Sequence, residues 1–262
     1  MTDDFARVYE MTANRITGPV AVEALKRVGG VKSGARVLDV GAGTGALAIP
    51  AAFSGAHVLA VDHAPGMIDL LSDRIAAFPD AKADLMDGQA LKMEDDSFDF
   101  AFSIFGVILF DDWRRGLSEM ARVVRRGGKG CVATWKTLPG GGPFVVMGRA
   151  LRTLFPDRMP PAPPEGLVVL SDPVRLAAEM QSAGFTDVAV TEVDALWTGP
   201  AGTAYLDEMA ALHGYMAPYA LLDGAQRSMV HEVILEIIEE FSQNGRTELP
   251  ATALIATGTK TL

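Results

Sequence analysis

Residues 37–50 read VLDVGAGTGALAIP, and this stretch decides how the chain folds. Its first four residues are a short, mainly apolar run of the kind that forms a buried parallel strand. Gly41, Gly43 and Gly45 follow at alternate positions, and helix-forming residues occupy 46–53. Glycine adopts positive φ without steric cost and lets backbone N–H groups approach a bound molecule. The stretch therefore predicts a strand, a ligand-binding turn and a helix.

The turn alone does not identify its ligand. Residues 41–46, GAGTGA, also satisfy G-x-G-x-x-[GA], the pattern that seats nicotinamide or flavin dinucleotides between a strand and a helix. Another interpretation is a glycine-rich turn that binds nothing and only packs tightly. Residues at the ends of the later strands have to separate these alternatives.

The composition is that of one globular domain that carries insertions. The chain has 262 residues, of which 49% are hydrophobic and 21% are charged, and its mean hydropathy is +0.20. No apolar run reaches the roughly 18 residues that a membrane span needs. The first ten residues, MTDDFARVYE, lack the basic start and apolar core of a signal peptide, so we expect a cytoplasmic protein.

The charge balance argues against nucleic acid as a partner. The formal net charge is −10, with 33 acidic and 23 basic residues, whereas binding to phosphates needs clustered basic groups. The dense basic cluster, Arg122, Arg125, Arg126 and Lys129, falls at the end of a predicted helix and is typical of a helix C-terminus. The single cysteine, Cys131, excludes an intramolecular disulfide and a cysteine-rich metal site, and we expect no metal.

Strands and helices alternate along most of the chain. We expect strands at 35–40, 57–62, 81–86, 98–103, 129–135, 185–193 and 252–259. We expect helices at 45–53, 65–78, 112–126, 171–183 with Ser171 as N-cap, 201–213 and 225–243, and one or two helices within 3–28. This alternation predicts βαβ units, and hence an α/β fold with a parallel sheet and helices on both faces.

Polar residues lie at or just after the ends of the central strands. They are Asp39, Asp62, Asp87 and Ser103. Right-handed crossovers bring the carboxyl ends of parallel strands to one edge, where open α/β sheets bind ligands. Asp62 follows Gly41 by 21 residues and is suited to accept two hydrogen bonds from a ribose diol. Met67 would lie against an adenine face and residues 87–89 would contact its edge, so adenosine is the best-supported fragment.

Four segments occur in an order and spacing that carry a family resemblance. They are VLDVGAGTG from residue 37, VDHAPGMI from 61, DGQALKMEDDSFDFAFSIFGVILF from 87 and RVVRRGGKGCVATW from 122. Together they resemble the class I S-adenosylmethionine-dependent methyltransferases, especially the small-molecule, UbiE/Coq5-like branch. The resemblance implies a Rossmann-like sheet of seven mostly parallel strands, the last one antiparallel, with helices on both faces and a helical cap. It also implies S-adenosyl-L-methionine as the cofactor.

The resemblance assigns residues to parts of that cofactor. It implies that Asp39, Gly41, Gly43 and Gly45 surround the methionine part and the ribose, and that Asp62 holds the ribose hydroxyls. It implies that His63 and Met67 border the adenine, and that Asp87, Gly88 and Gln89 meet its amino edge. The backbone carbonyl of Ser103 would lie near the methionine amino group. Arg15 is a further candidate, for the cofactor carboxylate.

The same reading divides the chain into segments. They are an N-terminal helical lid (1–30), a cofactor-binding core (31–137), a cap loop and helix (138–170), a core helix and strand (171–193), a helical substrate-cap insert (194–248) and a final core strand (249–262). The two cap segments are rich in aromatic and apolar residues, which suggests a mostly apolar acceptor.

Methyl transfer from a sulfonium is an in-line displacement that needs no metal and no dedicated nucleophile. A general base helps if the acceptor is a phenol or an enol, and His213 and Tyr9 are the candidates. Residues 104–106, Ile-Phe-Gly, replace the Asn/Asp-Pro-Pro-Tyr run by which base-modifying methyltransferases grip an exocyclic nitrogen. We therefore expect an oxygen or carbon acceptor in a small molecule.

Two other functions are compatible with the motifs. The first is a NAD-dependent oxidoreductase that uses the same glycine turn. The second is a methyltransferase-like domain that binds the cofactor without transferring methyl, as a regulatory partner or as a catalyst that closes a ring in a bound substrate. Whether two copies pair as a homodimer is left open by the sequence.

Overall fold

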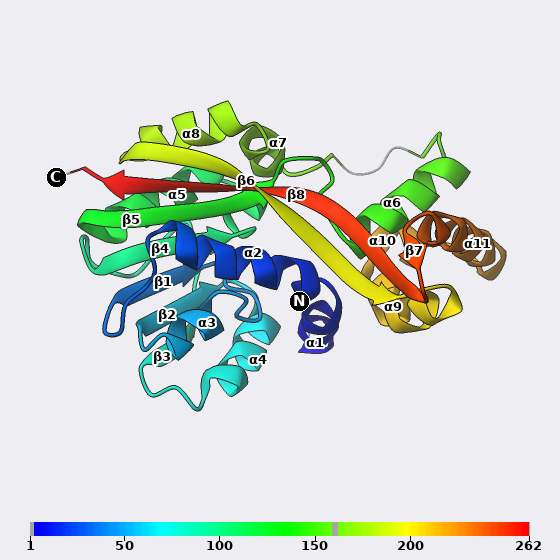
Figure 1. The fold of residues 1–262 in the computed structure, drawn as a ribbon, viewed down its shortest axis with the longest axis horizontal. Helices are drawn as coiled ribbons and strands as arrows, with labels where there is room; N and C mark the ends of the chain where they lie inside the picture. Colours follow the sequence, from blue (N-terminus) through cyan, green and yellow to red (C-terminus); the bar gives the residue numbers. More distant parts are fainter. Residues whose placement is uncertain (1–2, 159–161, 262) are drawn as a thin grey trace.

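One mixed sheet organises the chain (Figure 1). In the computed structural model, which describes residues 3–158 and 162–261, the strands are β1 (Arg36–Val40), β2 (His57–Asp62), β3 (Ala81–Leu85), β4 (Phe98–Ile104), β5 (Val124–Trp135), β6 (Phe185–Pro200), β7 (Ser242–Gln243) and β8 (Arg246–Lys260). Their order is β3-β2-β1-β4-β5-β8-β6, and β7 pairs with β8 outside that path. Neighbours from β3 to β5 are parallel, and β8 is antiparallel to β5 and β6. The predicted Rossmann-like fold with an antiparallel last strand is confirmed, with the short β7 in addition.

Helices cover both faces of this sheet. They are α1 (Asp3–Thr12), α2 (Asn14–Arg27), α3 (Ala48–Phe53), α4 (Pro65–Ile75), the 3-10 helix η1 (Val107–Leu109), α5 (Trp113–Val123), α6 (Pro143–Leu154), α7 (Glu165–Leu170), α8 (Pro173–Ser182), α9 (Thr203–Tyr215), α10 (Ala217–Ala220) and α11 (Gly224–Glu240). Helices α2, α3 and α4 lie on one face of the sheet, and α5 and α8 on the other. Within the described ranges, no helix combines the length and the apolar character that crossing a membrane requires.

The central strand β1 is buried because it has a parallel neighbour on each side and helices above and below. Leu38 lies opposite Leu59 of β2 and Ala101 of β4, and it is fully buried. The turn after β1 bends through Gly41 at φ 70°, where an added Cβ would lie 2.9 Å from the Cα of Gly106. Only glycine combines this conformation with that approach, so the alternate glycines are a requirement of the fold as well as of any ligand.

Strands β6 and β8 are longer than the sequence predicts. The strand expected to end at residue 193 continues to Pro200, and the strand expected from 252 begins at Arg246, which is the register partner of Pro200. The apolar alternation fails here because small Ala195 is buried while larger Leu196 is 43% exposed. The segment expected to start a helical insert at 194 therefore begins as a two-stranded ribbon. Figure 1 shows that this ribbon leads from the core to α6, α9, α10 and α11.

The basic cluster lies partly outside the predicted helix end. Helix α5 ends at Val123, so Arg122 is in its last turn, whereas Arg125, Arg126 and Lys129 lie on β5. Strand pairing of Val124 with Phe98 ends the helix earlier than the predicted residue 126.

The N-cap of α8 also differs from the prediction. Asp172 replaces Ser171, because its carboxylate accepts hydrogen bonds from the N–H groups of Val174 and Arg175 at 2.8 and 2.9 Å. Residues 159–161, inside the predicted cap loop, lie outside the described part of the chain.

The outer end of the ribbon should depend on Trp197. This side chain is fully buried, and its indole N–H donates to the Thr12 carbonyl at 2.8 Å. We expect Trp197→Ala to lower the free energy of unfolding by about 3–5 kcal/mol, measured by chemical denaturation. Trp197→Phe, which keeps most of the packing, should cost about 1 kcal/mol for the lost hydrogen bond. Val174→Ala is the exposed control, and an equal effect of all three variants would contradict this packing.

Candidate functional site

A network of hydrogen bonds joins the glycine turn to the end of the neighbouring strand. The N–H of Gly43 donates to Oδ2 of Asp62 at 2.9 Å, and the N–H of Ala64 donates to Oδ1 of the same carboxylate at 2.9 Å. The N–H groups of Gly41 and Ala42 both donate to the Val61 carbonyl. A Cβ placed on Gly43 would meet no atom within 4 Å. Hydrogen bonds to β2 therefore hold the turn on one side, and the space on the other side of Gly43 is open.

A cleft of ≈ 200 Å³ opens at this edge of the sheet. It is lined by Gly41, Asp62, His63, Met86, Asp87, Gly88, Gln89, Leu109, Phe110 and Asp111. The predicted residues after β1, β2 and β3 thus come together at one place. The lining carries three aspartates and no lysine or arginine, which suits a ligand that offers hydroxyl donors and positive charge.

The loop after β3 is held in position by Gln89. Asp87 accepts hydrogen bonds from the backbone N–H of Gln89 at 2.8 Å and from its side chain at 3.0 Å. These bonds, the backbone bond foremost, hold the pKa of Asp87 below its usual value. The side-chain oxygen of Gln89 accepts from the N–H of Asp112 at 2.7 Å. Gln89 therefore fastens the loop after β3 to the loop after η1, and residues of both loops line the cleft.

Two predicted polar residues lie beneath the cleft. Asp39 is buried, and its carboxylate accepts from the N–H of Ala48 in the first turn of α3 at 3.0 Å. Burial raises the pKa of Asp39 to about 7, and the charge of Asp62 acts in the same direction. Ser103 donates to the Val40 carbonyl at 2.7 Å and accepts from the N–H of Val107 at 2.9 Å. Both side chains join elements of the core and do not line the cleft.

Helix α1 closes over the same edge. Glu10 accepts a hydrogen bond from the Thr44 hydroxyl at 2.5 Å and forms an ion pair with Arg74 of α4, also at 2.5 Å. Met67 is 5% exposed and packs against a small cluster that includes Tyr9 of α1. Met67 and Gly45 therefore support the turn and the helix above it, and neither lines the cleft.

A second, apolar cavity of ≈ 260 Å³ adjoins the cleft. Its lining is Tyr9, Ala13, Ile16, Thr17, Phe105, Ile108, Leu109, Trp135, Pro139, Gly141, Phe144 and Leu167. The rings of Phe105 and Trp135 are stacked at 4.2 Å between centroids. Leu109 lines both the cleft and this cavity although 62% of it is exposed. The two spaces are therefore neighbours.

Phe105 and Leu109 were missed as site residues because apolar side chains carry no chemical signature in a sequence. Phe105 adopts φ 59°, a left-handed conformation that is uncommon for an aromatic residue and is not indicated by the residue type. The side chain of Phe105 is turned by this conformation onto the Trp135 ring. A detectable hint was the run Ile-Phe-Gly at 104–106, which begins at the last residue of β4, where a ligand edge is expected.

Two remaining candidates lie elsewhere. Arg15 forms an ion pair with Glu208 of α9 and lies over the Trp197 ring at 5.6 Å, so it joins α2 to the cap rather than lining the cleft. His213 is buried among aromatic rings, with its centroid 5.6 Å from that of Tyr219. Burial lowers the pKa of His213 to about 4.

Relatives of the chain are consistent with this geometry. Residues 37–128 match a family described as methyltransferase domain. The demethylmenaquinone methyltransferase of Corynebacterium glutamicum is 32% identical over 201 residues, which are 71% of this chain and 84% of that protein. The chain belongs to the class I S-adenosylmethionine-dependent methyltransferases. The cofactor of this family is S-adenosylmethionine, so the dinucleotide alternative is set aside.

Further comparisons place this methyltransferase among varied relatives. An uncharacterized protein of Mycobacterium tuberculosis is 37% identical over 159 residues, 59% of this chain and 53% of that protein, so the chain spans about half the length of these mycobacterial relatives. The phosphoethanolamine N-methyltransferase 2 of Haemonchus contortus aligns with a TM-score of 0.57 at 17% identity, covering 93% of this chain and 53% of that one. The [4+2]-cyclase SpnF aligns at 0.59 and 17%, covering 94% and 82%. These two structures show the shared fold.

The cleft of this methyltransferase fits the cofactor in its donor set. The Asp62 carboxylate accepts two backbone hydrogen bonds and has lone pairs left that could accept from a ribose diol. The open side of Gly43 leaves room for a bound molecule close to the backbone of the turn. We therefore expect Asp62→Ala to weaken S-adenosylmethionine binding at least about tenfold, measured by isothermal titration.

Two further variants make that test specific. Asp62→Asn keeps an acceptor for the Gly43 amide and should lose less affinity than Asp62→Ala. Asp80→Ala removes an aspartate that precedes β3 and pairs with His57, away from the cleft, and it should bind like the parent. Unchanged binding in both Asp62 variants would remove the ribose assignment.

The raised pKa of Asp39 predicts a pH-dependent stability. The folded chain keeps this proton up to about pH 7, whereas an unfolded chain with the usual value of 3.8 releases it earlier. Stability from Asp39 is thus complete below pH 4 and is lost as the pH rises through 7. Asp39→Asn should gain about 2–3 kcal/mol relative to the parent between pH 5 and pH 8, measured by denaturant unfolding. The exposed control Asp69→Asn should show no such change, and a pH-independent difference for Asp39→Asn would contradict the shift.

Proposed function

We propose that this chain transfers a methyl group from S-adenosylmethionine to an oxygen or carbon atom of a small, largely apolar molecule. The observation that carries the proposal is the position of Leu109, which lines both the acid-lined cleft and the aromatic cavity. A cofactor in the first space and an acceptor in the second would then lie on either side of Leu109. The relative from Corynebacterium glutamicum, named for a quinone precursor, supports an apolar acceptor.

Positioning supplies most of the proposed rate acceleration. An in-line displacement needs the acceptor atom and the methyl carbon aligned at about 3–3.5 Å, and alignment of this kind is worth roughly 7–11 kcal/mol. When bound, the cofactor supplies the activated methyl group. The stacked Phe105 and Trp135 rings would orient a flat acceptor in the cavity beside it.

Tyr9 is the polar side chain best placed to touch the acceptor. It lines the aromatic cavity, and burial, with the charges of Asp62 and Glu10, raises the pKa of its hydroxyl. The proposal therefore uses Tyr9 as a hydrogen-bond donor that stays protonated at neutral pH. His213 lines neither the cleft nor the cavity, and its lowered pKa of about 4 makes it a weak base, so the proposal gives it no proton to move.

A small molecule, rather than nucleic acid, is kept as the acceptor. Two arginines of the basic cluster are engaged in ion pairs: Arg122 pairs with Glu119 and Asp95 at 2.8 Å each, and Arg125 pairs with Asp99 at 2.5 Å. These guanidinium groups are not free to form a row of phosphate contacts. A cytoplasmic location remains part of the proposal.

The direct test uses methyl-labelled S-adenosylmethionine and demethylmenaquinone as the first acceptor, with an apolar cell extract as a second source of acceptors. We expect label to enter an organic-soluble product, identified by its mass. Cofactor binding without label in any product would favour the alternative of a domain that binds the cofactor but does not transfer methyl. Label in protein or nucleic acid alone would contradict the small-molecule acceptor.

The aromatic cavity generates a separate prediction. Trp135→Ala removes the ring that stacks on Phe105, and we expect the KM for the acceptor to rise roughly 10- to 100-fold. The affinity for S-adenosylmethionine should stay within about twofold because Trp135 does not line the cleft. Trp135→Phe, which retains a ring, should lie between the parent and the alanine variant. Equal losses of acceptor and cofactor affinity would mean a folding defect rather than a pocket.

A further inference from the structure

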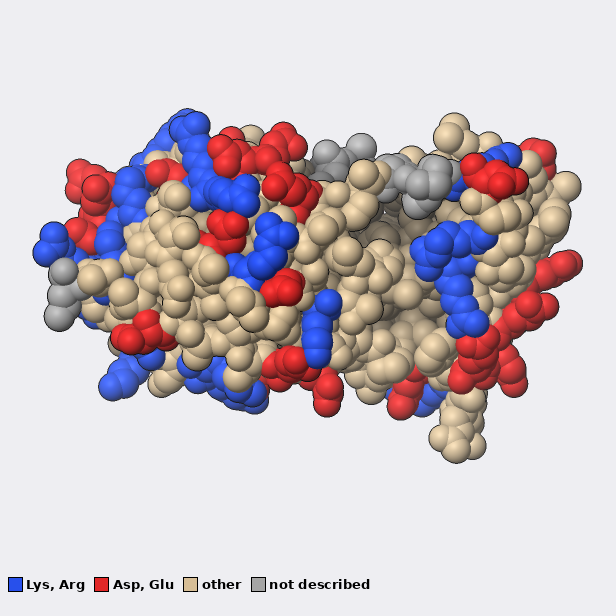
Figure 2. Space-filling model, turned by 90° about the horizontal axis from the view of Figure 1, so that it is seen from above, with Lys and Arg blue, Asp and Glu red and all other residues tan. Residues whose placement is uncertain are grey.

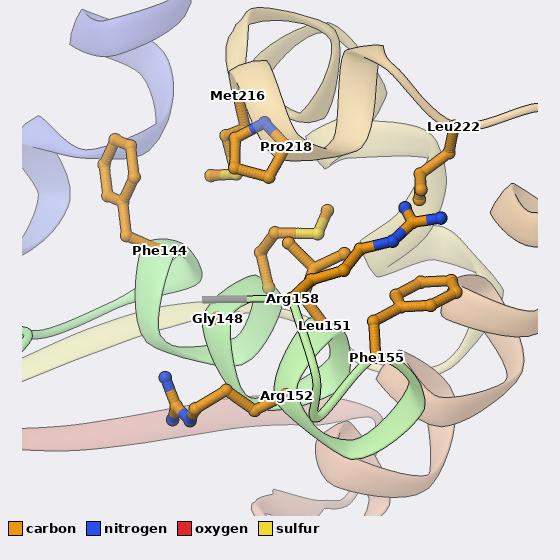
Figure 3. A pocket seen from close by; sticks show the side chains of 10 residues that line it. Phe144, Gly148, Leu151, Arg152, Phe155, Arg158, Met216, Pro218 and Leu222 are labelled. Atoms are coloured by element: carbon orange, nitrogen blue, oxygen red, sulfur yellow. The ribbon is translucent and has the colours of Figure 1, made fainter. Parts of the chain in front are cut away.

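A third cavity lies in the cap, between α6 and the α9–α10 corner (Figure 3). Its volume is ≈ 260 Å³, and its walls are mainly apolar, with Leu151 and Phe155 on the α6 side and Met216 and Pro218 opposite. Figure 3 shows these side chains converging from the two sides. The cap segments were expected to hold an apolar acceptor, and the cavity beside α6 is a distinct space within them.

This cap cavity continues the aromatic cavity. Phe144, at the start of α6, lines both spaces and is 39% exposed. Leu109 links the aromatic cavity to the cofactor cleft in the same way. The three spaces therefore follow one another from the sheet edge to the cap, and a molecule that fills the second and third must be elongated.

Two arginines distinguish the cap cavity from the other two spaces. Arg152 and Arg158 belong to its lining, which contains no acidic residue. Figure 3 shows Arg158 crossing the cavity, with its guanidinium toward Leu222, whereas the Arg152 side chain points away from Arg158 along α6. The Arg158 guanidinium lies over the Phe155 ring at 4.5 Å. Seen from above, the molecule has a hollow between its two parts (Figure 2). The residues around the hollow are mainly uncharged, and basic side chains lie at its right-hand edge.

Neither guanidinium has a carboxylate partner among the described residues. By contrast, Arg149 lies one turn before Arg152 on α6, and both of its terminal nitrogens donate hydrogen bonds to the Glu240 carboxylate, at 2.6 and 2.7 Å. The chain has 33 acidic and 23 basic residues, so acids are available to pair with arginines in most places. An unpaired arginine that crosses an apolar cavity complements an anion attached to an apolar body.

We propose that the methyl acceptor is an elongated amphiphile whose apolar body fills the aromatic and cap cavities and whose anionic end group is bound by Arg158. This inference rests on the proposed methyl transfer for the identity of the ligand as an acceptor. The end that receives the methyl group lies at the Leu109 junction, and the anionic end lies at the opposite end of the same path. A carboxylate fits the flat guanidinium fork with two parallel hydrogen bonds.

The test compares decanoate with decanol, which share an apolar chain and differ in the charge of the end group. Isothermal titration of the whole chain should give an affinity about tenfold higher for decanoate. In the variant Arg158→Gln the two probes should bind equally. The preference should also shrink as salt is raised, because Arg158 is exposed.

The matched control is Arg149→Gln, which removes a guanidinium of α6 that is already paired with Glu240. It should keep the preference for decanoate. Equal binding of both probes to the parent, a preference that survives in Arg158→Gln, or no binding of either probe would each overturn the proposal.

Titration with S-adenosylmethionine and the methyl-transfer assay, run on the same samples, separate this inference from the proposed function. Normal cofactor binding and methyl transfer with no preference for decanoate would reject the anionic end group alone. A preference for decanoate that depends on Arg158, in a chain that transfers no methyl, would support the anion subsite and reject the acceptor role assigned to it.

Discussion

Two backbone amides, from Gly43 and Ala64, converge on the single carboxylate of Asp62, and the rest of the site depends on this contact. It joins the turn after β1 to the end of β2, so the acid-lined cleft has a fixed wall. Asp39 lies one layer below, where burial and the charge of Asp62 favour its protonated form. Asp62 lines the cleft, while the buried Asp39 carboxyl accepts a hydrogen bond from the first turn of α3.

The central half of the fold could be predicted because its information is local. The runs that form β1 and β2 are short and apolar and end at a glycine or an acid, and right-handed connections leave one arrangement for such units. The extension of β6 could not be predicted in this way. Its partner, Arg246, lies far along the chain from Pro200, and exposed Leu196 beside buried Ala195 hides the alternation. The predicted N-cap of α8 was wrong for a simpler reason, since serine and aspartate, which occupy 171 and 172, are both favoured at the N-cap position.

The residues of the site also divide into those that could be predicted from the sequence and those that could not. Asp62, Asp87 and their neighbours were predicted to share an edge, because the carboxyl ends of parallel strands coincide there, and they all line the cleft. Leu109, which lines both the cleft and the aromatic cavity, gives no such signal because apolar residues are common in cores as well as pockets. Arg158 is informative only once its surroundings are known, since an arginine in a sequence does not reveal whether an acid is near it.

The pairing of Pro200 with Arg246 has a consequence for how such proteins diversify. The intervening stretch, with α9, α10 and α11, leaves and re-enters the sheet at adjacent points, so it behaves as one exchangeable cassette. Length or composition can change within it while both attachment points keep their places in the sheet. Because Met216 and Pro218 belong to this stretch whereas Leu151 and Phe155 do not, such changes would alter one wall of the cap cavity and leave the other as it is.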